Sequence, residues 1–202
     1  GTGMSYQLLI GGLPSGAPMT GTGASLDFGL QTTPGSYTVV ATNTTTGCVN
    51  NMAGSVAVTV KPLPTVYAVS SITNNYCAGS GGVDIRLTSS DAGVNYQLYN
   101  GTTTMGAPVA GSGSSIDFGY WLPAGPYTVI ATNTITGCSA TMAGGITISI
   151  NPLPTVYNVT GGGSYCNGGS GVHVGLSGSG SGITYQLLKD GIATGPAVAG
   201  SG

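Results

Sequence analysis

The stretch Tyr127-Thr-Val-Ile-Ala-Thr-Asn-Thr-Ile-Thr-Gly-Cys138 repeats an earlier stretch, Tyr37-Thr-Val-Val-Ala-Thr-Asn-Thr-Thr-Thr-Gly-Cys48, at an offset of 90 residues with ten of twelve positions identical. The hexapeptide Pro-Leu-Pro-Thr-Val-Tyr likewise occurs at residues 62–67 and again at 152–157. A fixed period of this size indicates tandem domains. With Pro-Leu-Pro as the joint, residues 62–151 form a complete repeat. Residues 1–61 are then the C-terminal part of a preceding repeat, and residues 152–202 the N-terminal part of a following one.

The joints between repeats are expected to be short and stiff. Each proline of Pro-Leu-Pro fixes its own φ angle and restricts the residue before it to extended conformations. Successive repeats should therefore stack end to end as a semi-rigid rod. Both ends of the chain fall inside a repeat, and a half-repeat cannot bury its core alone. We therefore expect this chain to be a segment of a longer polypeptide.

Each repeat has the pattern of short β-strands. In the complete repeat, the apolar residues Val83, Ile85 and Leu87 alternate with polar ones, which is typical of a half-buried strand. Similar short runs occupy residues 65–69, 94–98, 105–109, 116–118, 127–133 and 146–150. Clusters of Gly, Ser, Asn and Pro separate these runs, and no helical period is sustained. About seven strands in about 90 residues predict an all-β chain of tandem immunoglobulin-like antiparallel β-sandwich repeats.

Two tyrosines begin the penultimate strand of their repeats. Tyr37 and Tyr127 are each the last residue of a Gly-x-Tyr motif at a turn. This position suits a tyrosine corner, in which the hydroxyl group hydrogen-bonds to upstream backbone. The alternative is an ordinary core tyrosine after a turn.

The four cysteines also occupy repeated positions. Cys77 and Cys166 precede the second strand, whereas Cys48 and Cys138 lie in the turn between the last two strands. Two cysteines per repeat in a Thr-rich chain suggest disulfides and an oxidising, extracellular location. The simplest pairing is Cys77 with Cys138, but immunoglobulin topology places these turns at opposite ends of a sandwich. A staple between neighbouring repeats and free thiols therefore remain as alternatives.

The small number of charges limits the partners. The chain has three Lys or Arg residues and five Asp or Glu residues, with 40% hydrophobic residues. Three basic residues cannot neutralise a nucleic-acid backbone, and no apolar run is long enough for a transmembrane helix. Strand edges without lysine are open to pairing with another chain. We therefore expect self-association into a filament or tandem array, without nucleic acid or membrane insertion by this segment.

Catalytic and cofactor sites are not predicted. Asp117-Phe-Gly119 matches a kinase triplet, but the other kinase motifs are missing. The lone histidine, His173, aligns with Asp84 on the outward face of its strand, where we expect a solvated side chain. No Cys-x-x-Cys pair or carboxylate cluster predicts a zinc or calcium site. We expect no metal, no cofactor and no enzyme activity.

An aromatic pair, Tyr120-Trp121, replaces Leu30-Gln31 of the preceding repeat. Exposed aromatic side chains could contact a sugar or another chain, because they supply a large contact area. The alternative is a structural cluster that covers one end of the sandwich. Both interpretations remain open from the sequence.

One family pattern runs through the whole chain. It consists of Tyr76-Cys-Ala-Gly79, Tyr96-Gln-Leu98, the segment from Gly125 to Cys138, and Pro152-Leu-Pro154. This pattern resembles the immunoglobulin-like repeats of very large cell-surface proteins of Bacteroidota that are exported by the type IX secretion system, gliding adhesins among them. The resemblance implies secretion and attachment to the bacterial cell surface.

The sequence thus predicts a structural or adhesive repeat segment of a long extracellular protein that forms a rod or filament. Hydrophobic sandwich cores, proline joints and disulfides would hold such a stalk. One alternative is a polysaccharide-binding module that uses loop aromatics, and another is a set of spacer repeats attached to an enzyme domain elsewhere.

Overall fold

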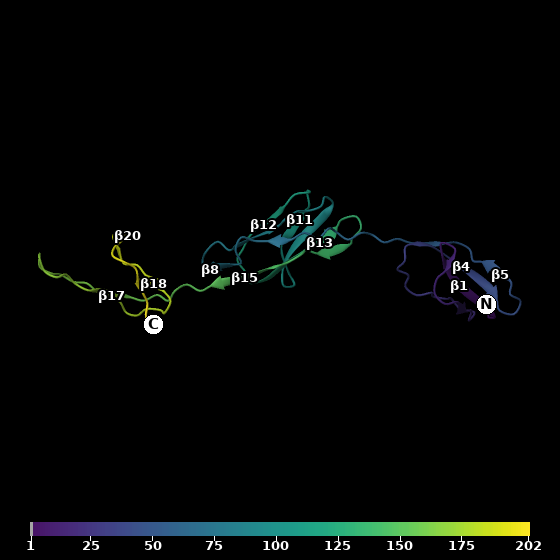
Figure 1. The fold of residues 1–202 in the computed structure, drawn as a ribbon, viewed down its shortest axis with the longest axis horizontal. Coiled ribbons are helices and arrows are strands. Elements are labelled where there is room, and N and C mark those ends of the chain that lie inside the picture. Colours follow the sequence, from purple (N-terminus) through teal and green to yellow (C-terminus); the bar gives the residue numbers. More distant parts are fainter. Residues whose placement is uncertain (1) are drawn as a thin grey trace.

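The structure, a computed structural model, describes residues 2–202 and contains no helix in that range. Strands form three groups, separated by the strand-free residues 59–68 and 152–158. Figure 1 shows the three groups in a row along the longest axis of the chain. The fold is an all-β tandem of immunoglobulin-like units, which confirms the predicted fold class.

The middle group is a sandwich of two sheets. One sheet has the strand order β12-β9-β7, and the other has the order β11-β10-β13-β15-β8, with β14 paired to β13. Paired strands are antiparallel except β8 and β15, which are parallel. The bounds are β7 Val69–Ser70, β8 Asn75–Cys77, β9 Val83–Leu87, β10 Val94–Asn100, β11 Thr103–Ala110, β12 Ile116–Trp121, β13 Gly125–Asn133, β14 Ser139–Thr141 and β15 Ile146–Asn151.

Most of these strands occur where the apolar runs predicted them. The run at residues 65–69 is the exception, because only its last residue belongs to a strand, β7. Two strands had no apolar pattern to reveal them: β8, which begins at Asn75, and β14, which begins at Ser139. Both are three residues long and polar, and they form because a neighbouring strand offers free hydrogen-bonding groups.

The core of the sandwich lies between the two sheets. Alternate residues of each strand point inward, as expected for the two-residue period of a β-strand. The side chains with no exposed surface are Val83, Ile85, Leu87, Tyr96, Leu98, Tyr127, Val129 and Ala131. Tyr67, Tyr76, Met105, Phe118 and Trp121 pack against this core from its rim. Residues 62–151 therefore contain a complete hydrophobic core of their own.

The repeated Tyr-Gln-Leu motif holds a hairpin closed in all three groups. The side-chain amide of Gln97 donates hydrogen bonds to the carbonyl oxygens of Leu98, Met105 and Gly106, at 2.9, 3.2 and 3.3 Å. Gln7 and Gln186 bond in the same way to their own hairpins. The glutamine thus replaces ladder bonds at the irregular pairing between β10 and β11, where the register shifts.

The first and third groups contain fewer strands. The first forms one sheet from β1 Met4–Ile10, β2 Leu13–Pro14, β3 Met19–Thr20, β4 Gly35–Asn43, β5 Val49–Asn51 and β6 Val56–Val58. The third forms three two-stranded pairs from β16 Val159–Gly161, β17 Val174–Leu176, β18 Thr184–Tyr185, β19 Leu188–Lys189, β20 Ile192–Ala193 and β21 Val198–Ala199. Neither group buries a core comparable to that of residues 62–151.

Candidate functional site

The two aromatic residues at the end of β12 point to opposite faces of their sheet. Trp121 turns inward, where its ring centroid lies 6.5 Å from that of Tyr127 and its indole N–H donates a hydrogen bond to the carbonyl of Phe118 at 3.1 Å. Tyr120 turns outward and is 71% exposed. Trp121 therefore covers the rim of the core. Of the two residues, only Tyr120 has a ring that is free to contact a ligand.

A group of charged side chains surrounds the position of Tyr120. Tyr120 lies directly opposite Asp84 in the β12–β9 register, and Asp117 lies opposite Arg86. The Arg86 Nε atom is 2.7 Å from Asp84 Oδ2, and its Nη2 atom is 3.3 Å from Asp117 Oδ2. We call Tyr120, Asp84, Arg86 and Asp117 the outer-face cluster.

The burial of Asp84 differs from the sequence expectation. The alternation in residues 83–88 suggested a solvated outward side chain, but Asp84 is only 7% exposed. Its Oδ2 atom is bonded to Arg86, and its Oδ1 atom is buried without a hydrogen-bond partner among the described residues. Because a buried charge is costly unless it is paired, the Arg86 guanidinium is what makes this position tolerable.

The outer-face cluster occurs only in the middle repeat among the described residues. Leu30 occupies the Tyr120 position in the first group, while His173 and Gly175 occupy the Asp84 and Arg86 positions in the third. His173 is exposed, as the sequence suggested. The charged groups of this cluster can form hydrogen bonds with hydroxyl groups. The exposed ring of Tyr120 can pack on the apolar face of a sugar. Sequence reasoning found Tyr120 but missed its charged neighbours.

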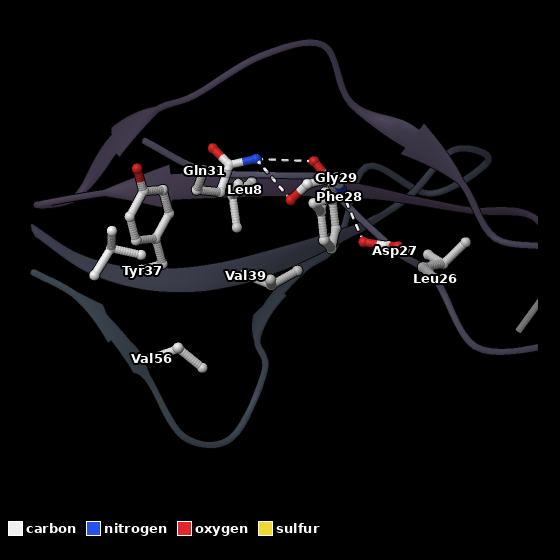
Figure 2. A pocket seen from close by; sticks show the side chains of 10 residues that line it. Leu8, Leu26, Asp27, Phe28, Gly29, Gln31, Tyr37, Val39 and Val56 are labelled. Atoms are coloured by element: carbon white, nitrogen blue, oxygen red, sulfur yellow. Dashed lines mark hydrogen bonds between the residues drawn. The ribbon is translucent and has the colours of Figure 1, made fainter. Parts of the chain in front are cut away.

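A mostly apolar hollow of about 400 Å³ lies in the first group. Figure 2 shows this groove and its apolar lining residues, which include Leu8, Leu26, Phe28, Tyr37, Val39 and Val56. The equivalent surface of the middle repeat lies under Val83, Ile85 and Leu87 of β9. Residues 2–61 contain no strand equivalent to β9. The groove is thus an uncovered part of a sandwich core. Its polar lining side chains, Asp27 and Gln31, make hydrogen bonds with the nearby backbone of Gly29 and Phe28.

Both predicted corner tyrosines donate the expected type of hydrogen bond. The hydroxyl group of Tyr127 donates to the carbonyl of Pro123 at 2.9 Å, and that of Tyr37 donates to the carbonyl of Thr33 at 2.8 Å. Each bond spans four residues upstream and closes the loop that precedes the strand. Burial raises the pKa of the Tyr127 hydroxyl, which keeps this donor protonated.

The complete repeat has two distinct poles. The entry pole is where the chain joins the sandwich, and it contains Tyr67, Asp91 and the turn at residues 134–138. The N–H group of Thr134 donates to the carbonyl of Gly93 at this pole, at 2.9 Å. The exit pole contains Asn151 and its register partner Cys77. The chain therefore enters the sandwich at one end and leaves it at the other.

The cysteines of the middle repeat lie at these opposite poles. Cys138 follows the end of β13 at Asn133, and its carbonyl accepts a hydrogen bond from the Asn133 N–H group. Cys77 lies beyond the other end of β13, which begins at Gly125. The eight residue-to-residue steps from Gly125 to Asn133 span about 26 Å, whereas a disulfide requires Cα atoms within about 7 Å. The pairing of Cys77 with Cys138 of the same repeat is therefore wrong.

All four cysteines of the described chain are unpaired. Cys48 lies in the same turn of the first group as Cys138 does in the second, and the Asn43 N–H group donates to its carbonyl. Cys48, Cys77 and Cys166 are exposed, and Cys138 is partly exposed. Each thiol thus lies at a surface position.

Metal-binding clusters and membrane-spanning helices are both missing among residues 2–202. No three His, Cys, Asp or Glu side chains in this range come close enough together to hold a metal ion. Within the same residues there is no helix whose length and apolar character would let it cross a bilayer.

The entry pole is fixed by a hydrogen bond that responds to pH. The Tyr67 hydroxyl donates to Asp91 Oδ1 at 2.6 Å. This bond lowers the pKa of the Asp91 carboxyl group, and the accepting carboxylate raises the pKa of Tyr67. The carboxyl contribution to stability is complete above its unfolded pKa of about 3.9 and is lost as the pH falls through the lower folded value.

We expect Tyr67→Phe to flatten the acid side of the stability profile. The unfolding midpoint of the unmodified chain should fall below about pH 4 more steeply than that of the variant, because only the unmodified chain loses this bond when Asp91 is protonated. Denaturant unfolding followed by the fluorescence of Trp121 measures both profiles. Parallel profiles between pH 3 and pH 7 would contradict the assignment.

Comparison with known proteins adds little about function. No protein-family model matches the chain, and no curated protein matches it. A search of solved structures found similarity to Dscam1 isoform 4.44, N-terminal four Ig domains, at 13% sequence identity and a TM-score of 0.22. The match covers 83% of this chain and 48% of that one, so the chain spans about half the length of that structure. At this level of similarity, no statement about function rests on the match.

Proposed function

We propose that this chain is a structural and adhesive segment of a long extracellular surface protein, in which tandem sandwiches form a rod. The observation that carries the proposal is the opposite placement of the entry and exit poles in residues 62–151. Copies of such a unit, joined in series, continue in one direction and do not fold back. The Pro-Leu-Pro joints support this direction because they restrict the linking backbone to extended conformations.

Composition and edges support a passive scaffold more than a catalyst. Eight charged residues in 202 leave few groups for acid–base chemistry, and the repeats resemble those of secreted Bacteroidota surface proteins. The edge strand β11 carries Pro108, which cannot donate to a further strand. End-to-end continuation is therefore a better route to a filament than lateral β-pairing through this edge.

The rod is tested by small-angle X-ray scattering on three copies of residues 62–151 joined in series. Because this repeat has its own core, the construction keeps each unit folded. A rod with a repeat of about 40 Å is about 120 Å long and has a radius of gyration of about 35 Å. A compact protein of that size has a radius of about 18 Å. A measured value near the compact figure would contradict the proposal.

A second candidate function is polysaccharide binding at the outer-face cluster. The exposed ring of Tyr120, opposite the Asp84–Arg86 pair, is the observation that favours it. Aromatic rings supply contact area for the apolar face of a sugar, and the charged groups supply hydrogen bonds.

For this candidate we expect Tyr120→Ala to reduce polysaccharide binding at least tenfold in a pull-down or glycan array. Tyr99 lies on β10, in the sheet that does not contain the outer-face cluster. Tyr99→Ala is therefore the matched control, and we expect it to bind polysaccharide normally. Trp121 packs against the core and does not face the ligand. Trp121→Ala should therefore weaken binding only to the extent that part of the protein has an unfolded middle repeat. Equal binding by the unmodified protein and by Tyr120→Ala would remove this candidate and leave the rod unaffected.

A further inference from the structure

We propose that neighbouring repeats are joined by a disulfide bond between Cys77 of one repeat and the cysteine equivalent to Cys138 in the repeat that follows. The proposal rests on the proposed rod and deepens it, because it names the covalent contact at each joint. The partner of Cys77 would lie in the turn that follows the β13-type strand of the next repeat, and the partner of Cys138 would lie at the exit pole of the preceding repeat.

The two poles of a repeat carry different cysteines, Cys77 at the exit pole and Cys138 at the entry pole. Within one repeat the two cysteines are at opposite ends, so they cannot pair with each other. In a tandem array, the exit pole of each repeat faces the entry pole of the next. Every joint therefore brings together one cysteine of each kind, and each kind recurs in the sequence, as Cys77 with Cys166 and as Cys48 with Cys138.

The turn at residues 134–138 reaches toward the preceding repeat. The entering chain runs parallel to the segment that follows this turn, through the bridge between Ala68 and Ala143. The Ala143 N–H group donates to the carbonyl of Tyr67 at 2.8 Å, which holds the two segments together. Counting back five residues along both segments places Leu63, in the middle of Pro-Leu-Pro, level with Cys138. The turn thus projects along the linker.

Cys77 lies beside the strand end from which the linker leaves its repeat. Cys77 is the register partner of Asn151, the last strand residue before Pro152, and the Ala78 N–H group donates to the Asn151 carbonyl at 2.9 Å. Because Leu153 is the equivalent of Leu63 one repeat later, the cysteine equivalent to Cys138 in the following sandwich is level with Leu153. Two residues of extended chain separate these levels, which is about 6–7 Å and within reach of the Cα separation of a disulfide.

The bond forms by thiol–disulfide exchange with an external disulfide, such as oxidised glutathione or an oxidised dithiol enzyme of the secretory route. One thiolate attacks the external disulfide and releases one reduced thiol. The second thiolate then attacks the mixed disulfide, which forms the bond between repeats and releases the second thiol. The two electrons and two protons lost by the repeats are carried by the two thiols of the reduced oxidant.

The test uses two copies of residues 62–151 in series, because this fusion recreates the natural joint between Asn151 and Pro-Leu-Pro. Under reducing conditions it has four free thiols. After equilibration in a glutathione redox buffer we expect two, and non-reducing peptide mapping should find Cys77 of the first copy bonded to Cys138 of the second. Cys77→Ser in the first copy should abolish this bond.

A matched control removes the cysteines at the two outer poles. With Cys138→Ser in the first copy and Cys77→Ser in the second, only the proposed pair remains, and we expect no free thiol after oxidation. Two free thiols in this variant, a bond between two molecules of it, or a bond within one copy of the unmodified fusion would each overturn the proposal. Scattering from the same samples separates the outcomes, because a rod with free thiols leaves the proposed function intact while removing the staple.

Discussion

Ile85→Ala is expected to destabilise the middle repeat by about 2–5 kcal/mol, which is a large share of the stability of a domain of this size. Ile85 has no exposed surface and lies at the centre of β9, between the two sheets of the sandwich. Removing its outer carbons loses their transfer free energy and leaves a cavity that the surrounding strands cannot fill. The repeat should remain folded in water but unfold at a clearly lower denaturant concentration.

The chain provides both a specific probe and a matched control for this measurement. Trp121 is the only tryptophan, and it packs against the core of the middle repeat, so its fluorescence reports the unfolding of that repeat alone. Val174 occupies the position of Ile85 in the third group but is 51% exposed. We expect Val174→Ala to leave the fluorescence transition unchanged. A shift of less than about 0.5 kcal/mol for Ile85→Ala would show that β9 does not close the core.

The sequence predicted the strands that carry apolar side chains and missed those that do not. β9, β10, β12, β13 and β15 were expected because their inward residues must be buried, which leaves a two-residue period in the sequence. β8 and β14 have no such period, since their backbones pair with strands already in place. A strand that forms by pairing its backbone with the free edge of a neighbouring strand does not need an alternating apolar pattern, so its sequence does not predict it.

The candidate sites were predicted less completely than the fold. The sequence singled out Tyr120 and Trp121 as a pair, but adjacent residues on a strand face opposite sides, so the structure separates them. Asp84 was expected in solvent because it alternates with apolar residues. Its pairing with Arg86 and Asp117 depends on the register and bulge between β9 and β12, which no local pattern encodes.

The cysteines show what the topology adds to the repeat pattern. Their spacing established two classes but left three possible states open. The strand register then placed one class at each pole, which removed pairing within a repeat. The number of residues between two cysteines does not show at which end of the sandwich each one lies. Excluding the pairing within a repeat therefore required the strand order.

Tyr127→Ala is expected to destabilise the middle repeat by about 3–5 kcal/mol, whereas Tyr127→Phe should cost only about 1 kcal/mol. The alanine variant removes a fully buried ring that contacts Trp121, while the phenylalanine variant removes only the hydroxyl donor to Pro123. Denaturant midpoints from circular dichroism and Trp121 fluorescence measure both variants. Equal losses for the two would mean that the hydroxyl bond, and not the ring, carries the effect.

Tyr37→Ala is the matched control, since Tyr37 makes the equivalent bond in the first group. The buried core cluster consists of residues between Val69 and Ile148, all in the middle repeat. The Trp121 transition should therefore stay within about 0.5 kcal/mol of the unmodified chain. A larger shift would show that stability passes across the joint. In that case the proposed rod would unfold as one cooperative unit. Independent transitions would instead mean that a load or a local lesion unfolds one repeat while its neighbours stay folded.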